Sequence, residues 1–319
     1  MLYVEQLLTL FEAYRKDHPF RGPVPELYEP ARYLMELGGK RLRPVFTLAV
    51  HQLFRNQLNE ALPAALAIEV FHNFSLMHDD IMDQSPLRRG KPTVHSKYNI
   101  NAAILSGDWM LIHTYEILNQ YKSKLAQSII RLMNETAIKI CEGQQRDINF
   151  ETRTTIKKEE YLDMIRDKTA VLLAAAARMG AMTAGASEED QKHLYHMGLN
   201  AGLAFQLMDD YLDAFGDQTG KMNGGDILQN KKTLLFIKTL EKANDEDRKA
   251  LLDLYEGREE DKVPKVLELF TRYGAGDKLK ALSQEYNQKA SDALAAVEAS
   301  SSRKEILNSL LTELLKRNI

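Results

Sequence analysis

Two short clusters of aspartates are the residues of this sequence best suited to chemistry. In each cluster the aspartates stand at positions i, i+1 and i+4; they are Asp79, Asp80 and Asp83, then Asp209, Asp210 and Asp213. On a helix, the first and last aspartates of such a cluster stack on one face, where their charges repel each other. Mg²⁺ is usually held by one or two carboxylates together with substrate phosphates. We therefore expect both clusters to bind Mg²⁺ beside a phosphorylated substrate.

Each aspartate cluster follows a segment that is apolar on nearly all sides. These segments are residues 61–78 and residues 194–208. A helix without a polar face is typical of the centre of a protein. The pattern predicts two central, buried helices that carry carboxylates at their C-terminal ends. Because the helix dipole disfavours anions there, a bound cation would stabilise both ends.

Two dense groups of basic residues flank the first central segment. The basic side chains of residues 38–44 and 86–95 are Lys40, Arg41 and Arg43, then Arg88, Arg89, Lys91 and His95. Arginine binds phosphate oxygens in a bidentate manner. Glycines in both groups allow the backbone to approach a ligand closely. These groups are therefore candidate diphosphate-binding sites.

The remainder of the chain has the pattern of helices joined by short connections. Only 9 prolines and 17 glycines interrupt 319 residues, and no run alternates strictly between apolar and polar positions as a strand would. Further helices are expected near residues 1–16, 25–37, 41–56, 101–120, 122–148, 275–298 and 302–317. Residues 216–231 form the one long loop candidate. We predict an all-α protein with a single domain over residues 1–319.

Composition excludes several classes of function. There are 42 basic and 45 acidic side chains, so the net charge of −3 argues against a general nucleic-acid or anionic-membrane surface. The single cysteine excludes an intrachain disulfide and a cysteine-based zinc site. Residues 170–186 are apolar but contain Arg178, and they fit a buried helix better than a membrane span. The N-terminus lacks the pattern of a signal peptide, so we expect a cytoplasmic protein.

Taken in order, the motifs resemble those of trans-isoprenyl diphosphate synthases of the farnesyl and geranylgeranyl type. The resemblance covers residues 38–233 and rests on GGKRLRP, HNFSLMHDDIMDQSPLRRGKPTVH, GQQRD, Lys168–Thr169, FQLMDDYLD and GKMNGGDILQNKKT. It implies a large helical bundle whose two central helices surround a deep apolar cavity. It also implies a homodimer that condenses isopentenyl diphosphate with dimethylallyl, geranyl or farnesyl diphosphate.

The resemblance assigns roles to individual residues. The two aspartate clusters match the pair that binds three Mg²⁺ ions around the allylic diphosphate. Basic positions that contact this diphosphate are matched by Arg88, Lys168, Lys221 and Lys231. Positions that hold the diphosphate of isopentenyl diphosphate are matched by Lys40, Arg43, His72 and Arg89. Thr169 and Gln206 match positions close to the reacting carbon, and Asp147 in GQQRD is a further candidate for substrate contact.

The implied reaction begins with cleavage of the allylic C–O bond, which leaves an allylic cation. The alkene of isopentenyl diphosphate then attacks this cation, and the released diphosphate can accept the proton that is lost. The growing tail should extend along the central helix away from Asp79. Phe74 and Ser75 lie about one helical turn of ~5.4 Å before Asp79, close to the length of one isoprene unit. Phe74 above all is expected to close the pocket at C20, with C15 as the alternative product.

Three other functions share some of these features. A class I terpene cyclase also uses Mg²⁺ and an aspartate-rich helix end, but it needs one diphosphate site, whereas two basic groups are present here. A non-catalytic regulatory subunit should have lost acidic positions, yet both clusters are intact. A helical scaffold without activity would leave the two acid-ended apolar helices unexplained.

Overall fold

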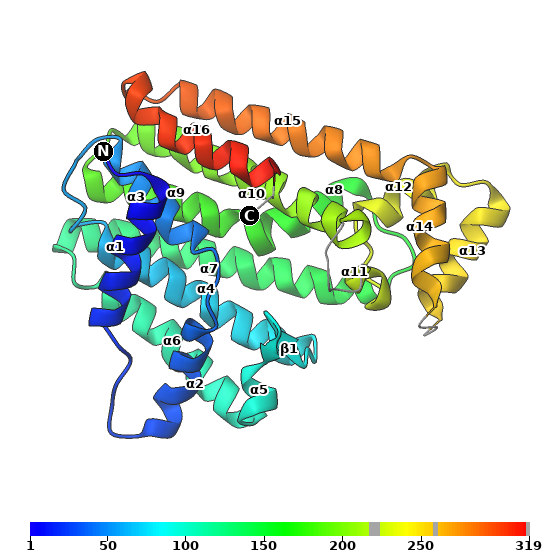
Figure 1. Cartoon of the computed structure of the whole chain (residues 1–319), viewed down its shortest axis with the longest axis horizontal. Helices are drawn as coiled ribbons and strands as arrows, with labels where there is room; N and C mark the ends of the chain where they lie inside the picture. The colour runs from blue at the N-terminus through cyan, green and yellow to red at the C-terminus, as the bar shows by residue number, and fades with distance from the viewer. Residues whose placement is uncertain (217–223, 258–260, 317–319) are drawn as a thin grey trace. The chain divides into compact units, whose positions relative to one another are not determined.

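The computed structural model describes residues 1–216, 224–257 and 261–316, and these residues are almost entirely helical (Figure 1). Within them, the only strands are β1 (Leu87–Arg88) and β2 (Lys91–Pro92), which pair antiparallel as a minimal hairpin. The all-α prediction is therefore confirmed.

The helices begin and end close to the expected positions. The first half of the chain forms α1 (Val4–Asp17), α2 (Pro25–Glu36), α3 (Leu42–Gln52), α4 (Leu62–Met82), α5 (Val94–Lys97), α6 (Ile100–Leu118) and α7 (Ser123–Glu151). The second half forms α8 (Lys158–Ile165), the π-helix η1 (Arg166–Ala170), α9 (Val171–Ala184), α10 (Glu188–Phe215), α11 (Gly225–Leu228), α12 (Leu234–Lys242), α13 (Asp245–Glu256), α14 (Lys262–Arg272), α15 (Ala275–Ala295) and α16 (Ser301–Lys316).

The chain divides into two compact units, each assembled from segments distant in sequence. The first unit comprises Met1–Asn134, Ala175–Tyr195 and Val297–Leu307, and the second comprises Glu135–Ala174, His196–Ala296 and Asn308–Ile319. The first aspartate cluster belongs to the first unit and the second cluster to the second unit. The single domain over residues 1–319 stays a prediction.

In the first unit, α4 is the central helix and packs against α3 and α6 (Figure 1). Pro63 lies in its first turn, where a missing N–H costs nothing. Almost every residue from Leu62 to Phe71 is buried, which confirms the prediction of a central helix at residues 61–78. The helix continues to Met82, with Asp83 as its C-cap, so the first aspartate cluster occupies its last turn.

The apolar segment that follows η1 is a buried helix, as predicted. Residues Val171 to Ala177 of α9 are almost completely shielded from solvent. At Gly180, a Cβ atom would lie 2.3 Å from the carbonyl oxygen of Thr47, so this part of α9 contacts α3 closely. None of the helices in the described part of the chain is long and apolar enough to cross a membrane.

In the second unit, an apolar core joins the C-terminal part of α10 to α8, α12, α14 and α15. Buried members of this core include Leu203, Leu207, Phe236, Phe270 and Leu279. The contact between α10 and the η1 region is close, because a Cβ atom at Gly202 would lie 2.6 Å from the Cα atom of Ala170. This packing fixes the backbone on which the second aspartate cluster stands.

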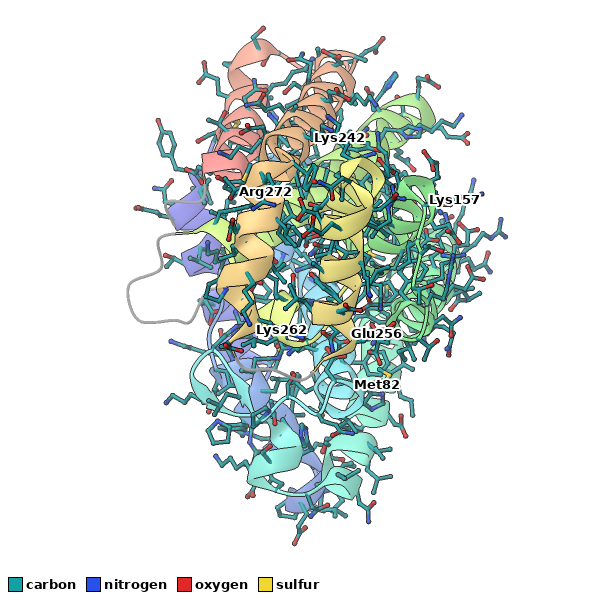
Figure 2. The ribbon with its side chains drawn as sticks, turned by 90° about the vertical axis from the view of Figure 1, so that its right-hand side faces the viewer. Met82, Lys157, Lys242, Glu256, Lys262 and Arg272 are labelled. Atoms are coloured by element: carbon teal, nitrogen blue, oxygen red, sulfur yellow. The ribbon has the colours of Figure 1, made fainter. Side chains whose placement is uncertain are left out.

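The helices α13 and α14 pack against each other at one end of the second unit. Arg272 and Lys262 mark the two ends of α14 (Figure 2). Arg272 donates to both carboxylate oxygens of Asp247 on α13 at 2.9 Å, and the Tyr273 hydroxyl donates to the same carboxylate at 2.6 Å. These bonds hold the two helices together.

Candidate active site

The middle aspartate of the first cluster binds an arginine of the hairpin. Asp80 is 1% exposed, and Arg88 donates to both of its carboxylate oxygens at 2.7–2.9 Å. Burial alone would lower the pKa of Arg88, but the charge of Asp80 raises it above its ordinary value. Asp80 therefore orients Arg88 at the C-terminal end of α4. Asp79 and Asp83 are half-buried and, by their i, i+4 spacing, share a face of that end.

The turn of the β1–β2 hairpin connects this helix end to the GGKRLRP segment. The backbone has positive φ at Arg89 (54°) and at Gly90 (74°), the latter a conformation that glycine adopts without strain. The Arg89 guanidinium donates to the carbonyl of Gly38. It also lies directly against Gly39, where a Cβ atom would approach it within 2.7 Å. Arg89 thus fixes the hairpin turn on the glycine loop.

Arg43 and His72 form a half-buried pair beside that loop. Arg43 Nη1 lies 3.2 Å from His72 Nε2, and because arginine has no acceptor, the imidazole nitrogen must accept. Burial, with the positive charges of Arg43 and Arg89, lowers the pKa of His72 well below its usual range. Burial also lowers the pKa of Arg43, and its Nε has no hydrogen-bond partner among the described residues. This positively charged pair, with one N–H group left without a hydrogen bond, suits an anion.

Two residues of the GGKRLRP segment have opposite environments. Lys40 is exposed, as expected for a ligand-binding cation. Arg41 is 5% exposed and donates to Glu69 at 2.6 Å and to Glu12 at 2.9 Å. The assignment of Arg41 to the basic ligand-binding group is therefore corrected, since its charge is neutralised inside the protein. Glu69 was not predicted; the signal that marks it is a lone charged residue in the apolar segment 61–78.

The middle aspartate of the second cluster is also held by the protein. Asp210 is 4% exposed, accepts a hydrogen bond from the Tyr161 hydroxyl, and accepts another from Gln206 Nε2 at 2.9 Å. Burial, together with the charge of Asp226, raises the pKa of Asp210 well above its usual range. Gln206 was predicted to lie near the reacting carbon; the structure shows that its amide orients Asp210. Tyr161 was not predicted.

Asp226 extends the second cluster and was not predicted from the sequence. Its backbone N–H donates to Asp213 Oδ2 at 2.9 Å, so α11 lies beside the end of α10. Burial and the charge of Asp213 raise the pKa of Asp226 to about 6, and Lys231 opposes this shift. Lys231 therefore acts electrostatically on these carboxylates, and its contact with the allylic diphosphate stays a prediction. Lys221 lies outside the described residues.

The predicted Lys168–Thr169 pair lies in the π-helix η1. Such single-turn π-helices are frequent at functional sites, because the extra residue redirects side chains. Lys168 Nζ donates to Asp147 Oδ2 at 2.5 Å, and Thr169 is half-buried. At Gly143 a Cβ atom would lie 2.3 Å from the backbone nitrogen of Lys168, so α7 supports η1 directly. A substrate contact of Asp147 stays a prediction.

The predicted chain-length residues lie one turn before the first cluster. The Phe74 ring is half-buried and meets Phe71 and His78 edge-on, with centroid separations of 5.3 Å and 5.0 Å. His78 Nε2 lies 3.2 Å from the carbonyl oxygen of Ile104 on α6. The Ser75 hydroxyl donates to the carbonyl of His72 at 2.9 Å. Phe74 is therefore braced by ring contacts on its own helix.

The donor chemistry of these clusters fits Mg²⁺ held jointly with a ligand. Among the described residues, no three His, Cys, Asp or Glu side chains meet closely enough to bind a metal ion alone. Mg²⁺ commonly takes only one or two carboxylates and completes its octahedron with phosphate oxygens and water. Asp79 and Asp83, with Asp209 and Asp213, provide that number of carboxylates at each helix end.

Comparison with known proteins finds matches to one protein family over most of the chain. The polyprenyl synthetase family model matches residues 24–272. The geranylgeranyl diphosphate synthase of Sulfolobus acidocaldarius is 44% identical over 237 residues, which cover 72% of each chain. The geranylfarnesyl diphosphate synthase of Aeropyrum pernix is 38% identical over 296 residues, or 89% of this chain and 92% of that one. A crystal structure of a geranylgeranyl pyrophosphate synthase superimposes with a TM-score of 0.94, 40% identity and full coverage of both chains.

Proposed function

Because the chain belongs to the polyprenyl synthetase family and is a trans-prenyltransferase, we propose that it condenses isopentenyl diphosphate with an allylic diphosphate to geranylgeranyl diphosphate. Members of this family depend on Mg²⁺ in general. Three Mg²⁺ ions, bound by Asp79, Asp83, Asp209 and Asp213 with the allylic diphosphate, are part of the proposal. Asp80 and Asp210 were also expected as metal ligands, but they accept hydrogen bonds from Arg88 and Tyr161 and are assigned an orienting role instead.

The observation that carries the proposal is the bidentate pair of Asp80 and Arg88. It joins a basic residue suited to diphosphate to the same helix end that presents Asp79 and Asp83. The carboxylates proposed to bind metal and the guanidinium proposed to bind phosphate are therefore held at the same end of α4. A diphosphate bound there would meet both kinds of partner, as a diphosphate leaving group requires.

The second diphosphate is assigned to Lys40, Arg43, His72 and Arg89. The buried Nε of Arg43 and the neutral His72 support this assignment, because a bound diphosphate would complete their hydrogen bonding. Arg89 adds a cation fixed to the glycine loop. Two separate anion sites are what a condensation of two diphosphates needs, whereas a cyclase needs only one.

The proposed mechanism uses this chain's own residues for binding and shielding. Bound Mg²⁺ supplies charge stabilisation for the leaving diphosphate. Arg88, Lys168 and Lys231 bind the same group, and Lys168 leaves Asp147 to do so. Thr169 presents its hydroxyl oxygen to the allylic cation, and Asp210 fixes Gln206 nearby. The apolar walls of the central helices exclude water, which would otherwise convert the cation to an alcohol. The proton lost on condensation passes to the released diphosphate.

Product length is proposed to be set by Phe74 as the floor of a deep apolar cavity. Its place one turn before Asp79, and its ring contacts with Phe71 and His78, support a fixed obstacle to the growing tail. A relative of 44% identity is named as a geranylgeranyl diphosphate synthase, which favours the C20 product. The C15 product is the alternative.

The reaction class can be tested by following inorganic diphosphate. We expect release only when isopentenyl diphosphate, an allylic diphosphate and Mg²⁺ are all present, and none after removal of Mg²⁺ by EDTA. Release from the allylic diphosphate alone, accompanied by a cyclic hydrocarbon, would contradict the proposal and indicate a cyclase.

A homodimer in the cytoplasm completes the proposal. One face of α6 exposes four large apolar side chains, at 40–68% of their accessible area: Ile100, Ile104, Leu105 and Ile112. These four side chains form an apolar stripe that also contains the exposed Asp108, and exposed apolar groups of this kind are typical of a protein–protein interface. A second copy of this chain, meeting the same stripe across a two-fold axis, would cover it.

A further inference from the structure

The basic loop before α3 contains one cation that faces the protein interior. Lys40 is exposed, whereas the next residue, Arg41, is 5% exposed. The residues on either side of Lys40 have positive φ, 132° at Gly39 and 48° at Arg41, both in the left-handed region. A non-glycine residue rarely adopts this conformation unless its surroundings impose it. Here they do so through the side chain of Arg41.

The guanidinium of Arg41 is bound on three sides. It donates to Glu69 Oε1 on α4 at 2.6 Å, to Glu12 Oε1 on α1 at 2.9 Å, and to the carbonyl of Met35 at the end of α2. The Glu69 carboxylate is itself oriented by Asn73, whose Nδ2 lies 3.1 Å away. Burial alone would lower the pKa of Arg41, but Glu69 and Glu12 raise it above its ordinary value. The N-cap of α3 is thus anchored to three other helices.

A buried ion pair of this kind usually adds little to the free energy of unfolding. Its desolvation cost often equals the attraction gained, and apolar residues of similar volume usually serve as well. What the pair does provide is a fixed direction for the backbone on both sides of Arg41. Lys40 precedes it, and Arg43 follows it in the first turn of α3, next to His72. Both cations belong to the site proposed for isopentenyl diphosphate.

We propose that Arg41 is a positioning residue for the isopentenyl diphosphate site: its buried pair with Glu69 sets the left-handed turn that presents Lys40 and Arg43 to one diphosphate. The inference rests on the proposed function. It separates the two adjacent cations of GGKRLRP into one that binds ligand and one that shapes the loop. Arg89 closes the loop from the other side through Gly38.

The test compares Michaelis constants for the two substrates in four variants. Arg41→Gln removes the anchor, Arg41→Lys preserves the charge, and Arg41→Gln with Glu69→Gln removes the pair without leaving an unpaired buried charge. Arg15→Gln is the matched control, because Arg15 binds the same Glu12 at 2.7 Å but lies outside the loop. Circular dichroism and thermal melting establish that each variant is folded.

We expect the KM for isopentenyl diphosphate to rise about tenfold or more in Arg41→Gln and in the double variant, as for a misplaced charge-assisted hydrogen bond. The KM for the allylic diphosphate should change less than about twofold, since its site is built elsewhere. Arg41→Lys should recover part of the affinity, and Arg15→Gln should resemble the wild type.

Two results would overturn the inference and leave the proposed function intact. A folded double variant with the wild-type KM for isopentenyl diphosphate would show that the pair does not position the loop. Equal increases in both Michaelis constants would show a general structural role. A wild-type protein that consumes no isopentenyl diphosphate would instead refute the proposed function itself, and this inference with it.

Discussion

At the level of single residues, the middle aspartates Asp80 and Asp210 are alike in burial and differ in partner. Asp80 binds the cation Arg88, while Asp210 accepts from the neutral groups of Tyr161 and Gln206. Both therefore orient other side chains, and the outer aspartates of each cluster are better placed for metal. The spacing of the clusters was evident in the sequence, but Arg88 and Tyr161 lie 8 and 49 residues away from them and only folding brings them together.

The neutral state of His72 has a consequence for stability. His72 stays uncharged in the folded protein, whereas the unfolded chain binds a proton below a pH of about 6.5. The free energy of unfolding therefore falls below that pH, by about 1.4 kcal/mol per pH unit, because only the unfolded chain gains a proton. His72→Gln, which keeps an acceptor for Arg43, should reduce this loss. Urea unfolding of both proteins at pH 7.5 and 5.5 measures it; identical pH dependence would contradict the neutral assignment.

Phe74 gives a prediction about product length. Phe74→Ala removes the ring that meets Phe71 and His78, so the cavity should deepen and products of C25 or longer should form. Ser75→Ala, on the same turn, is the control: it keeps a small side chain at the second chain-length position and should leave the product unchanged. Chromatographic sizing of the dephosphorylated alcohols measures both. An unchanged product from Phe74→Ala would exclude Phe74 as the floor.

At the level of elements, the helices were predictable where apolar residues recur along the chain at helical spacing or in long segments. The central segment 61–78 became α4, and the apolar segment 194–208 became part of α10. The π-helix η1 and the β1–β2 hairpin were not predictable, because close packing and a left-handed turn leave little periodic signal. The pairing of Glu69 with Arg41 was also not predictable, since it spans 28 residues, although Glu69 stands out as a charged residue in an apolar segment.

The support of η1 by α7 can be tested at Gly143. A methyl group there would lie 2.3 Å from the backbone nitrogen of Lys168, so Gly143→Ala must displace Lys168 and Thr169. Displacement of reacting groups by about 1 Å can cost about a hundredfold in rate, and we expect kcat to fall on that order. Steady-state kinetics measures the fall.

Gly257→Ala is the matched control, because the nearest atom to its Cβ would be 3.4 Å away. It should retain wild-type kcat. Comparable kcat values for the Gly143 variant and this control would show that η1 tolerates displacement and that close support from α7 is not needed for catalysis.

At the level of the whole molecule, the apolar stripe of α6 predicts the assembly. Light scattering coupled to size-exclusion chromatography should give twice the chain mass for the wild type. Leu105→Glu with Ile112→Glu places two charges in the stripe and should yield monomers. Gln284→Glu with Ser309→Glu places two charges on other exposed positions and should leave the dimer intact. A wild-type monomer, or a dimeric stripe variant, would contradict the predicted interface.

The most direct test of the proposed function is the length of the product formed from labelled isopentenyl diphosphate. The wild-type protein would be incubated with Mg²⁺ and with dimethylallyl, geranyl or farnesyl diphosphate in turn. We predict a linear C20 alcohol after dephosphorylation, from each primer, and no labelled product without Mg²⁺. A C15 product would retain the chemistry and contradict the Phe74 floor. Absence of label from every prenyl product would contradict the central claim, that this chain condenses isopentenyl diphosphate with an allylic diphosphate.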